Sequence, residues 1–354
     1  MKKIIVIPGD GIGKEITDSA VAVLKKIDEK FKIGFEFDYR DAGGASYDKY
    51  GEPLTAETLD ACKKADAILF GAVGGPKWDN IEVSKRPERA LFALRKGLGL
   101  YGNLRPVKIY DALIDGSPLK PELVRGVDLV IVRELVGGIY FGPRCESEIV
   151  DGVEQAHDTE VYSVPEIERI ARLAFELARK RRKKVTSVDK ANVLASSRLW
   201  RRVVAEVAKD FPDVELNNLY VDNCAAQLAI NPKQFDVVLS NNMFSDILSD
   251  EVAVIGGSLG LLPSASIGAG TGFYECSGGA ANSLAGQNIA NPIAEILSAA
   301  LLLRYSLNEE KAAQAIEAAV DKTLADGYRT ADIYKDGLKK VGTVEMTAAI
   351  VDRI

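Results

Sequence analysis

Two aspartates in one predicted helix have the spacing to hold a divalent metal ion. Asp246 and Asp250 are four residues apart within residues 242–251, which places both on one helix face. Two like charges at this spacing repel each other unless a cation or an arginine lies between them. Their hard oxygen atoms suit Mg²⁺ or Mn²⁺, which bind a few carboxylates and keep positions for water and substrate. Taken alone, a solvated helix face is the simpler interpretation of the pair.

Three arginines could bind a substrate that carries carboxylates. Arg95, Arg105 and Arg133 stand at or near the ends of predicted elements. The planar guanidinium group grips a carboxylate through paired hydrogen bonds. A substrate with two or more carboxylates would use several arginines, whereas each arginine considered alone is more simply a surface or ion-pair residue.

The first glycine-rich turn, residues 9–13, matches neither common nucleotide-binding fingerprint. The Rossmann spacing needs a glycine at position 14, where Lys14 stands. A P-loop ending at Lys14 would need glycine at position 8 and serine or threonine at position 15, but the chain has Pro8 and Glu15. The glycines therefore indicate either a tight turn into a helix or a nucleotide contact of another kind.

Composition excludes several classes of protein. A net charge of −6 provides no cationic field for nucleic acid. No apolar run approaches the ~18 residues of a membrane span, and the first apolar run is too short for a signal peptide, so a cytoplasmic protein is expected. The single histidine, His157, lies in a polar stretch, which excludes sites built on several histidines. The cysteines are far apart and predict buried free thiols rather than a zinc site or disulfides: Cys62, Cys145, Cys224 and Cys276.

Apolar periodicity predicts alternating strands and helices, hence an α/β protein with mainly parallel sheets. Strands are expected near residues 3–7, 35–39, 67–73, 128–132, 184–188, 219–221 and 236–239. Helices are expected over residues 165–182, 196–209, 292–305, 309–324 and 344–354. No linker or repeat marks a domain boundary.

Several ordered motifs resemble the isocitrate/isopropylmalate dehydrogenase family, and within it the isopropylmalate branch, over nearly the whole chain. They are Pro-Gly-Asp-Gly-Ile-Gly at 8–13, Gly-Ala-Val-Gly-Gly-Pro-Lys-Trp-Asp at 71–79, Leu-Arg-Pro at 104–106, Arg-Glu at 133–134, Gly-Ile-Tyr-Phe-Gly at 138–142, Val-Asp-Lys-Ala-Asn at 188–192, Tyr-Val-Asp-Asn at 220–223 and Asp-Ile-Leu-Ser-Asp-Glu at 246–251. The resemblance implies a two-domain α/β fold of that family, not a Rossmann fold. Residues 1–99 plus 253–354 would form a cofactor-side domain, and residues 100–252 a substrate, metal and dimerisation domain.

The resemblance also implies a homodimer whose active sites lie between the domains and borrow residues from the partner subunit. Arg95, Arg105 and Arg133 would bind the substrate carboxylates, with Leu91 as an apolar wall. Asp246, Asp250 and Asp222 of the partner subunit would bind Mg²⁺ or Mn²⁺, and Asp222 would also contact the substrate. Lys190 of the partner subunit would act as general base, and Tyr140 would protonate the product carbon. Cofactor contacts would come from Ile12, Glu88, Glu275, Gly278, Ser283 and Asn291.

The function that this resemblance implies is the oxidative decarboxylation of 3-isopropylmalate to 4-methyl-2-oxopentanoate and CO₂, a step of leucine biosynthesis. Isocitrate enzymes carry polar residues before the first substrate arginine, where they meet a third carboxylate. This chain has Glu88, Leu91 and Phe92 in that stretch. We therefore expect a preference for 3-isopropylmalate over isocitrate, with related 3-alkylmalates also accepted.

One loop departs from the family pattern. Where the family typically has Tyr-Glu-Pro-Ile-His-Gly-Ser-Ala-Pro-Asp-Ile-Ala-Gly, residues 274–286 read Tyr-Glu-Cys-Ser-Gly-Gly-Ala-Ala-Asn-Ser-Leu-Ala-Gly. Gly278 replaces a histidine that contacts adenosine, and Ser283 replaces an aspartate that receives the ribose hydroxyls. Loss of a charged acceptor typically costs ~1.5–3 kcal/mol, so weaker NAD binding is expected. NADP is the less favoured cofactor because residues 276–286 contain no Lys or Arg to attract its phosphate. The alternative is a non-catalytic homologue that serves as a regulatory or structural subunit.

Overall fold

The computed structural model describes all 354 residues, which divide into two compact units. Unit 1 comprises residues 1–100, 109–121 and 256–354, and unit 2 comprises residues 101–108 and 122–255. Residues 109–121 belong to unit 1 although the sequence analysis assigned them to the middle domain. The reason is local: Arg329 donates to the carbonyl oxygen of Ala112 at 2.6 Å, and α11 packs on this segment.

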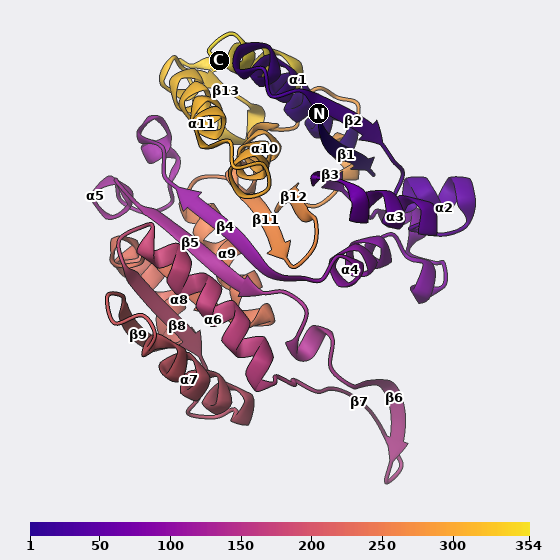
Figure 1. The fold of residues 1–354 in the computed structure, drawn as a ribbon, viewed down its shortest axis with the longest axis vertical. Helices are drawn as coiled ribbons and strands as arrows, with labels where there is room; N and C mark the ends of the chain where they lie inside the picture. Colours follow the sequence, from indigo (N-terminus) through magenta and orange to yellow (C-terminus); the bar gives the residue numbers. More distant parts are fainter. The chain divides into compact units, whose positions relative to one another are not determined.

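Unit 1 contains a run of paired strands with helices packed against them (Figure 1). The strand order is β2-β1-β3-β12-β11, parallel except for the antiparallel pair β11 and β12. The elements are β1 (Lys2–Gly9), α1 (Gly13–Phe31), β2 (Phe35–Tyr39), α2 (Gly44–Tyr50), α3 (Ala56–Lys64), β3 (Ala67–Ala72), α4 (Glu88–Gly97), β11 (Pro263–Gly268), β12 (Gly272–Cys276), α10 (Ile293–Tyr305), α11 (Glu310–Ala325), β13 (Tyr328–Arg329), β14 (Lys339–Lys340) and α12 (Thr343–Val351). All six residues of β3 are buried, as expected for a parallel strand covered on both faces.

Unit 2 also contains five paired strands, in the order β4-β5-β10-β8-β9. Only β4 and β5 run antiparallel. The elements are β4 (Leu100–Lys108), α5 (Pro121–Val124), β5 (Asp128–Glu134), β6 (Arg144–Val150), β7 (Val153–Asp158), α6 (Val164–Arg179), β8 (Lys184–Asp189), α7 (Ala195–Ala208), β9 (Glu215–Tyr220), α8 (Val221–Ile230), β10 (Val237–Ser240) and α9 (Asn242–Ile255). Helices α6 and α7 cover one face of the strands, and α8 and α9 cover the other (Figure 1).

The β6–β7 hairpin projects from the rest of unit 2 (Figure 1). Every residue of β7 is exposed, so this strand buries no side chain against the rest of the chain. Its tip is Asp151-Gly152, and both residues have positive φ, which suits a two-residue hairpin turn. No helix of the chain is long and apolar enough to cross a membrane.

The predicted α/β class and mainly parallel strands are confirmed, while the boundaries of several elements differ. The strand expected at residues 219–221 is β9, which ends at Tyr220, so Val221 begins α8. The helix expected to reach residue 182 ends at Arg179, because Lys183 turns into the left-handed region at φ 59°. The helix expected to reach residue 354 ends at Val351.

Candidate active site

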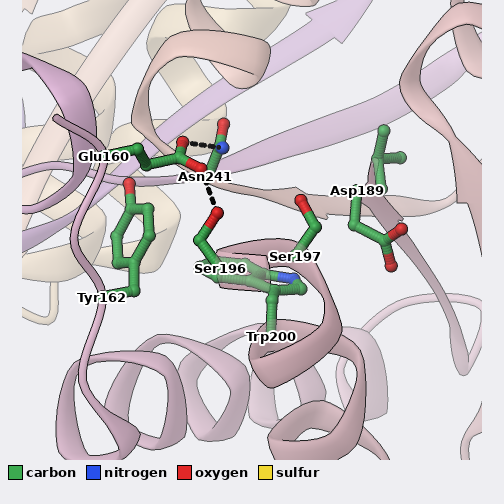
Figure 2. A pocket seen from close by; sticks show the side chains of 8 residues that line it. Glu160, Tyr162, Asp189, Ser196, Ser197, Trp200 and Asn241 are labelled. Carbon is green, nitrogen blue, oxygen red and sulfur yellow. Dashed lines mark hydrogen bonds between the residues drawn. The ribbon is translucent and has the colours of Figure 1, made fainter. Parts of the chain in front are cut away.

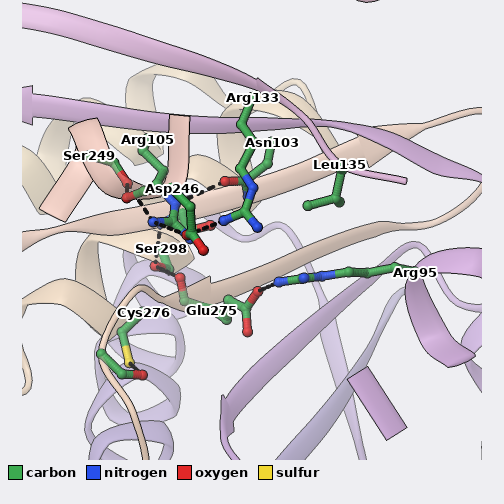
Figure 3. A network of polar contacts seen from close by, with 12 residues as sticks. Arg95, Asn103, Arg105, Arg133, Leu135, Asp246, Ser249, Glu275, Cys276 and Ser298 are labelled. Carbon is green, nitrogen blue, oxygen red and sulfur yellow. Dashed lines mark hydrogen bonds and ion pairs between the residues drawn. The ribbon is translucent and has the colours of Figure 1, made fainter. Parts of the chain in front are cut away.

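Asp246 of α9 lies beside two buried arginines of unit 2 (Figure 3). Arg133 donates to Asp246 Oδ1 through its Nη1 atom. Arg105 Nη1 lies 3.3 Å from Asp246 Oδ1 and 3.6 Å from Asp250 Oδ1. Arg133 is 4% exposed and Arg105 is 7% exposed, so both positive charges are held in the protein interior. Arg105 therefore supplies a positive charge within reach of both aspartates, which reduces their mutual repulsion.

Strand pairing fixes the two arginines. Arg133 on β5 stands opposite Asn103 on β4, and Arg105 lies two residues further along β4. Asn103 Oδ1 accepts from Arg105 Nε at 3.0 Å. Ser249 Oγ accepts from Arg105 Nη1 at 2.6 Å, which ties the strand to α9. These neutral acceptors orient the guanidinium group without removing its charge.

The start of α9 is fixed by Asn242, which sequence reasoning missed. Its Oδ1 atom accepts from Arg133 Nε at 2.8 Å, and its amide nitrogen donates to the carbonyl oxygens of Leu135 and Gly137 at 3.1 Å each. The backbone N–H of Asn242 donates to Tyr162 Oη at 2.9 Å. Nothing in the spacing of these residues indicates the contacts, because Asn242 and Arg133 are 109 residues apart.

Tyr140 stands at the edge of this cluster, in the short turn Gly138–Tyr140. Its hydroxyl donates to Asp246 Oδ2 at 3.4 Å, and the Arg133 guanidinium carbon lies 5.9 Å from its ring centre. Partial burial, reinforced by the Asp246 charge, raises the pKa of Tyr140. A phenol that keeps its proton and is 38% exposed can donate that proton to a bound molecule.

The α9 carboxylates fit a hard divalent cation in part. Burial raises the pKa of Asp250, the Arg105 charge opposes that shift, and the neighbouring Asp246 adds to it. This chain contains no group of three or more Asp, Glu, His or Cys residues that could hold a metal ion. The two carboxylates therefore offer an incomplete ligand set, which further oxygen atoms from a substrate, water or another chain would have to complete.

Lys190 and Asp222 form a second polar pair in unit 2. Lys190 Nζ lies 2.6 Å from Asp222 Oδ1, and this hydrogen bond lowers the pKa of Asp222. Asp222 is in the first turn of α8, where the helix dipole favours a carboxylate. Its side chain is 67% exposed, so it is accessible to a neighbouring molecule.

In unit 1, Arg95 pairs with Glu275 in a buried position (Figure 3). Arg95 Nη2 donates to Glu275 Oε1 at 2.9 Å. Arg95 Nε is also buried but has no hydrogen-bond partner. A buried guanidinium N–H without an acceptor is costly, and a substrate carboxylate would provide one. Leu91 precedes Arg95 by one helical turn of α4, which puts both on the same face.

The altered loop is attached to unit 1 at several points. Ile12 N donates to Ala280 O at 2.8 Å, and Asn282 Nδ2 donates to Gly74 O at 3.0 Å. Ser283 is exposed. A Cβ atom at Gly278 would meet only the Cys276 sulfur, at 4.0 Å, so the backbone does not require glycine there. The position therefore has room for the first side-chain atom of a larger residue.

The other two predicted cofactor residues have contacts of their own. Asn291 Oδ1 accepts from Ile293 N at 3.0 Å at the start of α10, and its amide donates to Asp332 Oδ2 at 3.0 Å. Asn291 therefore stabilises the helix start. Glu88 is exposed, and its Oε1 atom would lie 2.6 Å from a Cβ atom at Gly74. A larger residue at position 74 would therefore contact the Glu88 carboxylate, and glycine avoids this contact.

The first glycine-rich turn has a structural role, which favours its interpretation as a tight turn into a helix over a nucleotide contact. Asp10 is buried and accepts backbone N–H bonds from Gly44, Ala45 and Gly74 at 2.8–2.9 Å. A Cβ atom at Gly9 would lie 1.9 Å from the Ala72 carbonyl oxygen, so only glycine allows this close approach.

The remaining sequence predictions concern His157 and the cysteines. His157 is exposed on β7 and lies 3.1 Å from Glu148, as expected for a surface residue. All four cysteines are free thiols, and only Cys145 is not buried.

Side chains that hydrogen-bond one another line a small pocket of unit 2 (Figure 2). Glu160 accepts from Asn241 Nδ2 at 2.8 Å through one carboxylate oxygen and from the Ser196 hydroxyl through the other. Trp200 Nε1 donates to Ser187 Oγ at 3.2 Å. These polar groups already have partners, so this pocket offers no obvious ligand chemistry.

The fold and the arginine–carboxylate cluster define an α/β enzyme that handles a small carboxylate-bearing molecule. The family model described as isocitrate/isopropylmalate dehydrogenase matches residues 3–350, and the chain belongs to this family. It is 59% identical over 354 residues to a 3-isopropylmalate dehydrogenase of Clostridium pasteurianum, covering 99% of both chains. It is 58% identical over 346 residues to that of Clostridium acetobutylicum, covering 97% of both chains.

Solved structures agree with the family assignment. A crystal structure of isocitrate dehydrogenase from Methylococcus capsulatus matches with a TM-score of 0.88 at 36% identity, covering 100% of this chain and 99% of that one. A β-decarboxylating dehydrogenase from Thermococcus kodakarensis matches with a TM-score of 0.82 at 36% identity, covering 100% of this chain and 96% of that one.

Proposed function

We propose that this chain catalyses the oxidative decarboxylation of 3-isopropylmalate to 4-methyl-2-oxopentanoate and CO₂, the leucine-biosynthetic reaction that its relatives' names indicate. The observation that carries the proposal is the cluster of Arg105, Arg133, Tyr140 and the α9 aspartates. It occurs in a chain 59% identical to a 3-isopropylmalate dehydrogenase. No contact in the cluster favours the non-catalytic alternative.

Three arginines would bind the two substrate carboxylates. Arg105 and Arg133 are buried and held by Asn103, Ser249 and Asn242, so their donors are already oriented before binding. Arg95 would contribute its Nε atom, which is buried and has no other acceptor. Leu91 would contact the isopropyl group. One methylene is worth only ~1–3 kcal/mol, so related 3-alkylmalates should react as well.

Asp246 and Asp250 would hold Mg²⁺ or Mn²⁺ together with Asp222 of the partner subunit. The charge balance supports this: a doubly negative malate and a doubly positive ion add no net charge to two arginines and two aspartates. Bound there, the ion supplies Lewis-acid chemistry at the substrate oxygens. Asp246 would then exchange part of its contact with Arg133 for the ion, which frees Arg133 for the substrate.

The remaining residues would move protons. Lys190 of the partner subunit would accept, as a neutral amine, the proton of the C2 hydroxyl, directly or through water. NAD, when bound, would supply the hydride acceptor for the C2 hydrogen. The C3 carboxylate then leaves as CO₂, and Tyr140 donates its phenolic proton to C3. Its raised pKa keeps that proton in place until it is needed.

NAD is the proposed cofactor, with weaker binding than in relatives that keep the loop aspartate. Ile12 and Glu275 would line its site, since the Ile12 backbone holds the loop at Ala280. The loop offers no cation for a 2′-phosphate, which argues against NADP. A cytosolic location stays a prediction.

A homodimer with shared sites is proposed because α8 and α9 expose large apolar side chains. Ile230 and Ile247 are each 60% exposed, and Val254 is 52% exposed. Such residues, on the two helices that carry Asp222 and Asp250, would be covered by a second copy of the chain. The projecting β6–β7 hairpin adds exposed Ile149 and Val153, at 76% and 65%.

The test is NADH formation at 340 nm by the purified protein with Mn²⁺ and millimolar NAD or NADP. We expect turnover of 3-isopropylmalate with NAD, and at least 100-fold lower kcat/KM for isocitrate, which is about 2.8 kcal/mol. Comparable turnover of the two substrates would refute the substrate assignment. Silence with both cofactors would favour the non-catalytic alternative.

A further inference from the structure

The peptide group that joins Glu275 to Cys276 is held by two side chains of α10. Ser298 Oγ donates to the carbonyl oxygen of Glu275 at 2.8 Å. The backbone N–H of Cys276 donates to Glu295 Oε2 at 2.9 Å. Cys276 is the last residue of β12 and the first residue of the altered loop. Helix α10 therefore fixes both polar atoms of the peptide at which this loop begins.

Glu295 is an unusual acceptor because it is fully buried. Its exposed fraction is 0%, and its second oxygen, Oε1, has no hydrogen-bond partner. The charged group that acts on it is Glu275, which repels a second negative charge. Strands β3 and β11, which also pack on α10, carry no titratable residues. Helices α1 and α11 pack on α10 as well and carry charged residues, but Glu275 is the charge that shifts the pKa of Glu295. Burial, opposed only by the Cys276 N–H, raises the pKa of Glu295 well above its usual range.

The contact bears on the proposed substrate and cofactor residues of unit 1. Glu275 is the ion-pair partner of Arg95, with 2.9 Å between Oε1 and Nη2, and both side chains are buried. A shift of the Glu275 backbone would displace its carboxylate and change the direction in which Arg95 points. The same shift would move residues 276–286, which begin at the peptide that Glu295 holds.

We propose that Glu295 is a positioning residue: its buried carboxyl fixes the backbone of Cys276 and thereby sets Glu275 opposite Arg95 and the altered loop against α10. The kinetic tests of this role rest on the proposed function. Because Tyr140 and Lys190 remain in place, the role concerns binding of substrate and cofactor rather than the chemical step.

Steady-state kinetics with 3-isopropylmalate, Mn²⁺ and NAD distinguish a positioning role of Glu295 from a general loss of folded structure. Glu295→Ala removes the acceptor and should raise the KM for NAD and for 3-isopropylmalate about tenfold each, about 1.4 kcal/mol, with kcat within about twofold. Glu295→Gln keeps an acceptor oxygen and should restore both KM values. The proposal is overturned if Glu295→Ala leaves both KM values within about twofold of wild type, or if Glu295→Gln behaves like Glu295→Ala.

A double-mutant cycle with Cys276 tests the hydrogen bond itself. Proline has no backbone N–H, so in a Cys276→Pro background Glu295 has nothing to hold. Glu275 is in extended conformation, as a residue before proline must be. Adding Glu295→Ala to Cys276→Pro should therefore change KM by less than about twofold. Adding it to Cys276→Ala, which keeps the N–H, should still cost about tenfold. Equal costs in both backgrounds would overturn the proposal.

Hydrogen exchange provides a readout that does not depend on turnover. The amide of Cys276 should exchange at least tenfold faster in Glu295→Ala than in wild type, and at the wild-type rate in Glu295→Gln. Unchanged exchange in Glu295→Ala would overturn the positioning role. An inactive wild-type protein with this exchange pattern would instead refute only the proposed function.

Discussion

Replacing Arg133 by lysine probes the arginine–carboxylate cluster most sharply. Lysine keeps the positive charge but replaces a planar fork by a single point charge. In the structure, Arg133 donates from Nε to Asn242 Oδ1 at 2.8 Å and from Nη1 to Asp246 Oδ1. The ammonium group of Arg133→Lys can keep one of these two hydrogen bonds. It cannot form both and also bind a substrate carboxylate.

The expected loss follows from the number of contacts. One charge-assisted hydrogen bond is worth ~1.5–3 kcal/mol, and Arg133 is only 4% exposed, so water does not replace it. We therefore expect kcat/KM for 3-isopropylmalate to fall about 10- to 150-fold at saturating NAD and Mn²⁺. The matched control is Arg172→Lys, because Arg172 forms a surface pair with Asp210 at 2.8 Å and its side chain is 43% exposed.

The control substitution should leave kcat/KM within about twofold of wild type, because exposed ion pairs contribute ~0–1 kcal/mol to stability and this one touches no substrate. The reasoning is refuted if Arg133→Lys keeps kcat/KM within about threefold of wild type. It is also refuted if Arg172→Lys loses as much activity as Arg133→Lys.

Two further predictions concern unit 1. Ser283→Asp should lower the KM for NAD about 2- to 10-fold, and the gain should be modest because position 283 is exposed. The neutral Ser283→Asn should leave this KM unchanged. Equal KM values for the two variants would contradict the expectation that a carboxylate at position 283 strengthens NAD binding. For Glu295, the folded-state pKa lies above the unfolded value, so its contribution to stability is present below about pH 4.3 and is lost as pH rises toward the folded pKa. The free energy of unfolding of Glu295→Gln relative to wild type should thus rise with pH in that window, by up to about 1.4 kcal/mol per pH unit, as measured by denaturant titration. A difference that does not change with pH would contradict the raised pKa of this carboxyl.

Helix periodicity made part of the site predictable. Asp246 and Asp250 were expected on one face of a helix, and α9 spans both of them. Their common neighbour, Arg105, could not be derived from spacing because it lies on a strand more than 140 residues earlier. Asn242 and Ser249 were missed for the same reason, since polar residues inside a helix resemble solvated ones until their long-range partners are known.

Strand prediction failed where apolar patterning is weak. Residues 263–268 contain two serines and two glycine or proline residues, so β11 carries no clear alternation. The β6–β7 hairpin has almost no buried residue to reveal it, although the Asp151-Gly152 pair was an available turn signal. Glu295 was expected only as part of an amphipathic helix. Burial of its carboxyl depends on tertiary packing, which the sequence does not specify locally.

Mixed dimers test the central claim that Asp246 of one subunit works with Lys190 of the other. Asp246→Asn and Lys190→Met should each abolish turnover of 3-isopropylmalate when expressed alone. Heterodimers isolated with two affinity tags should recover about half of the wild-type activity, because the wild-type Asp246 of one subunit meets the wild-type Lys190 of its partner in one of the two sites. If the heterodimer is as inactive as either parent, each site is built within one chain, and the account is contradicted.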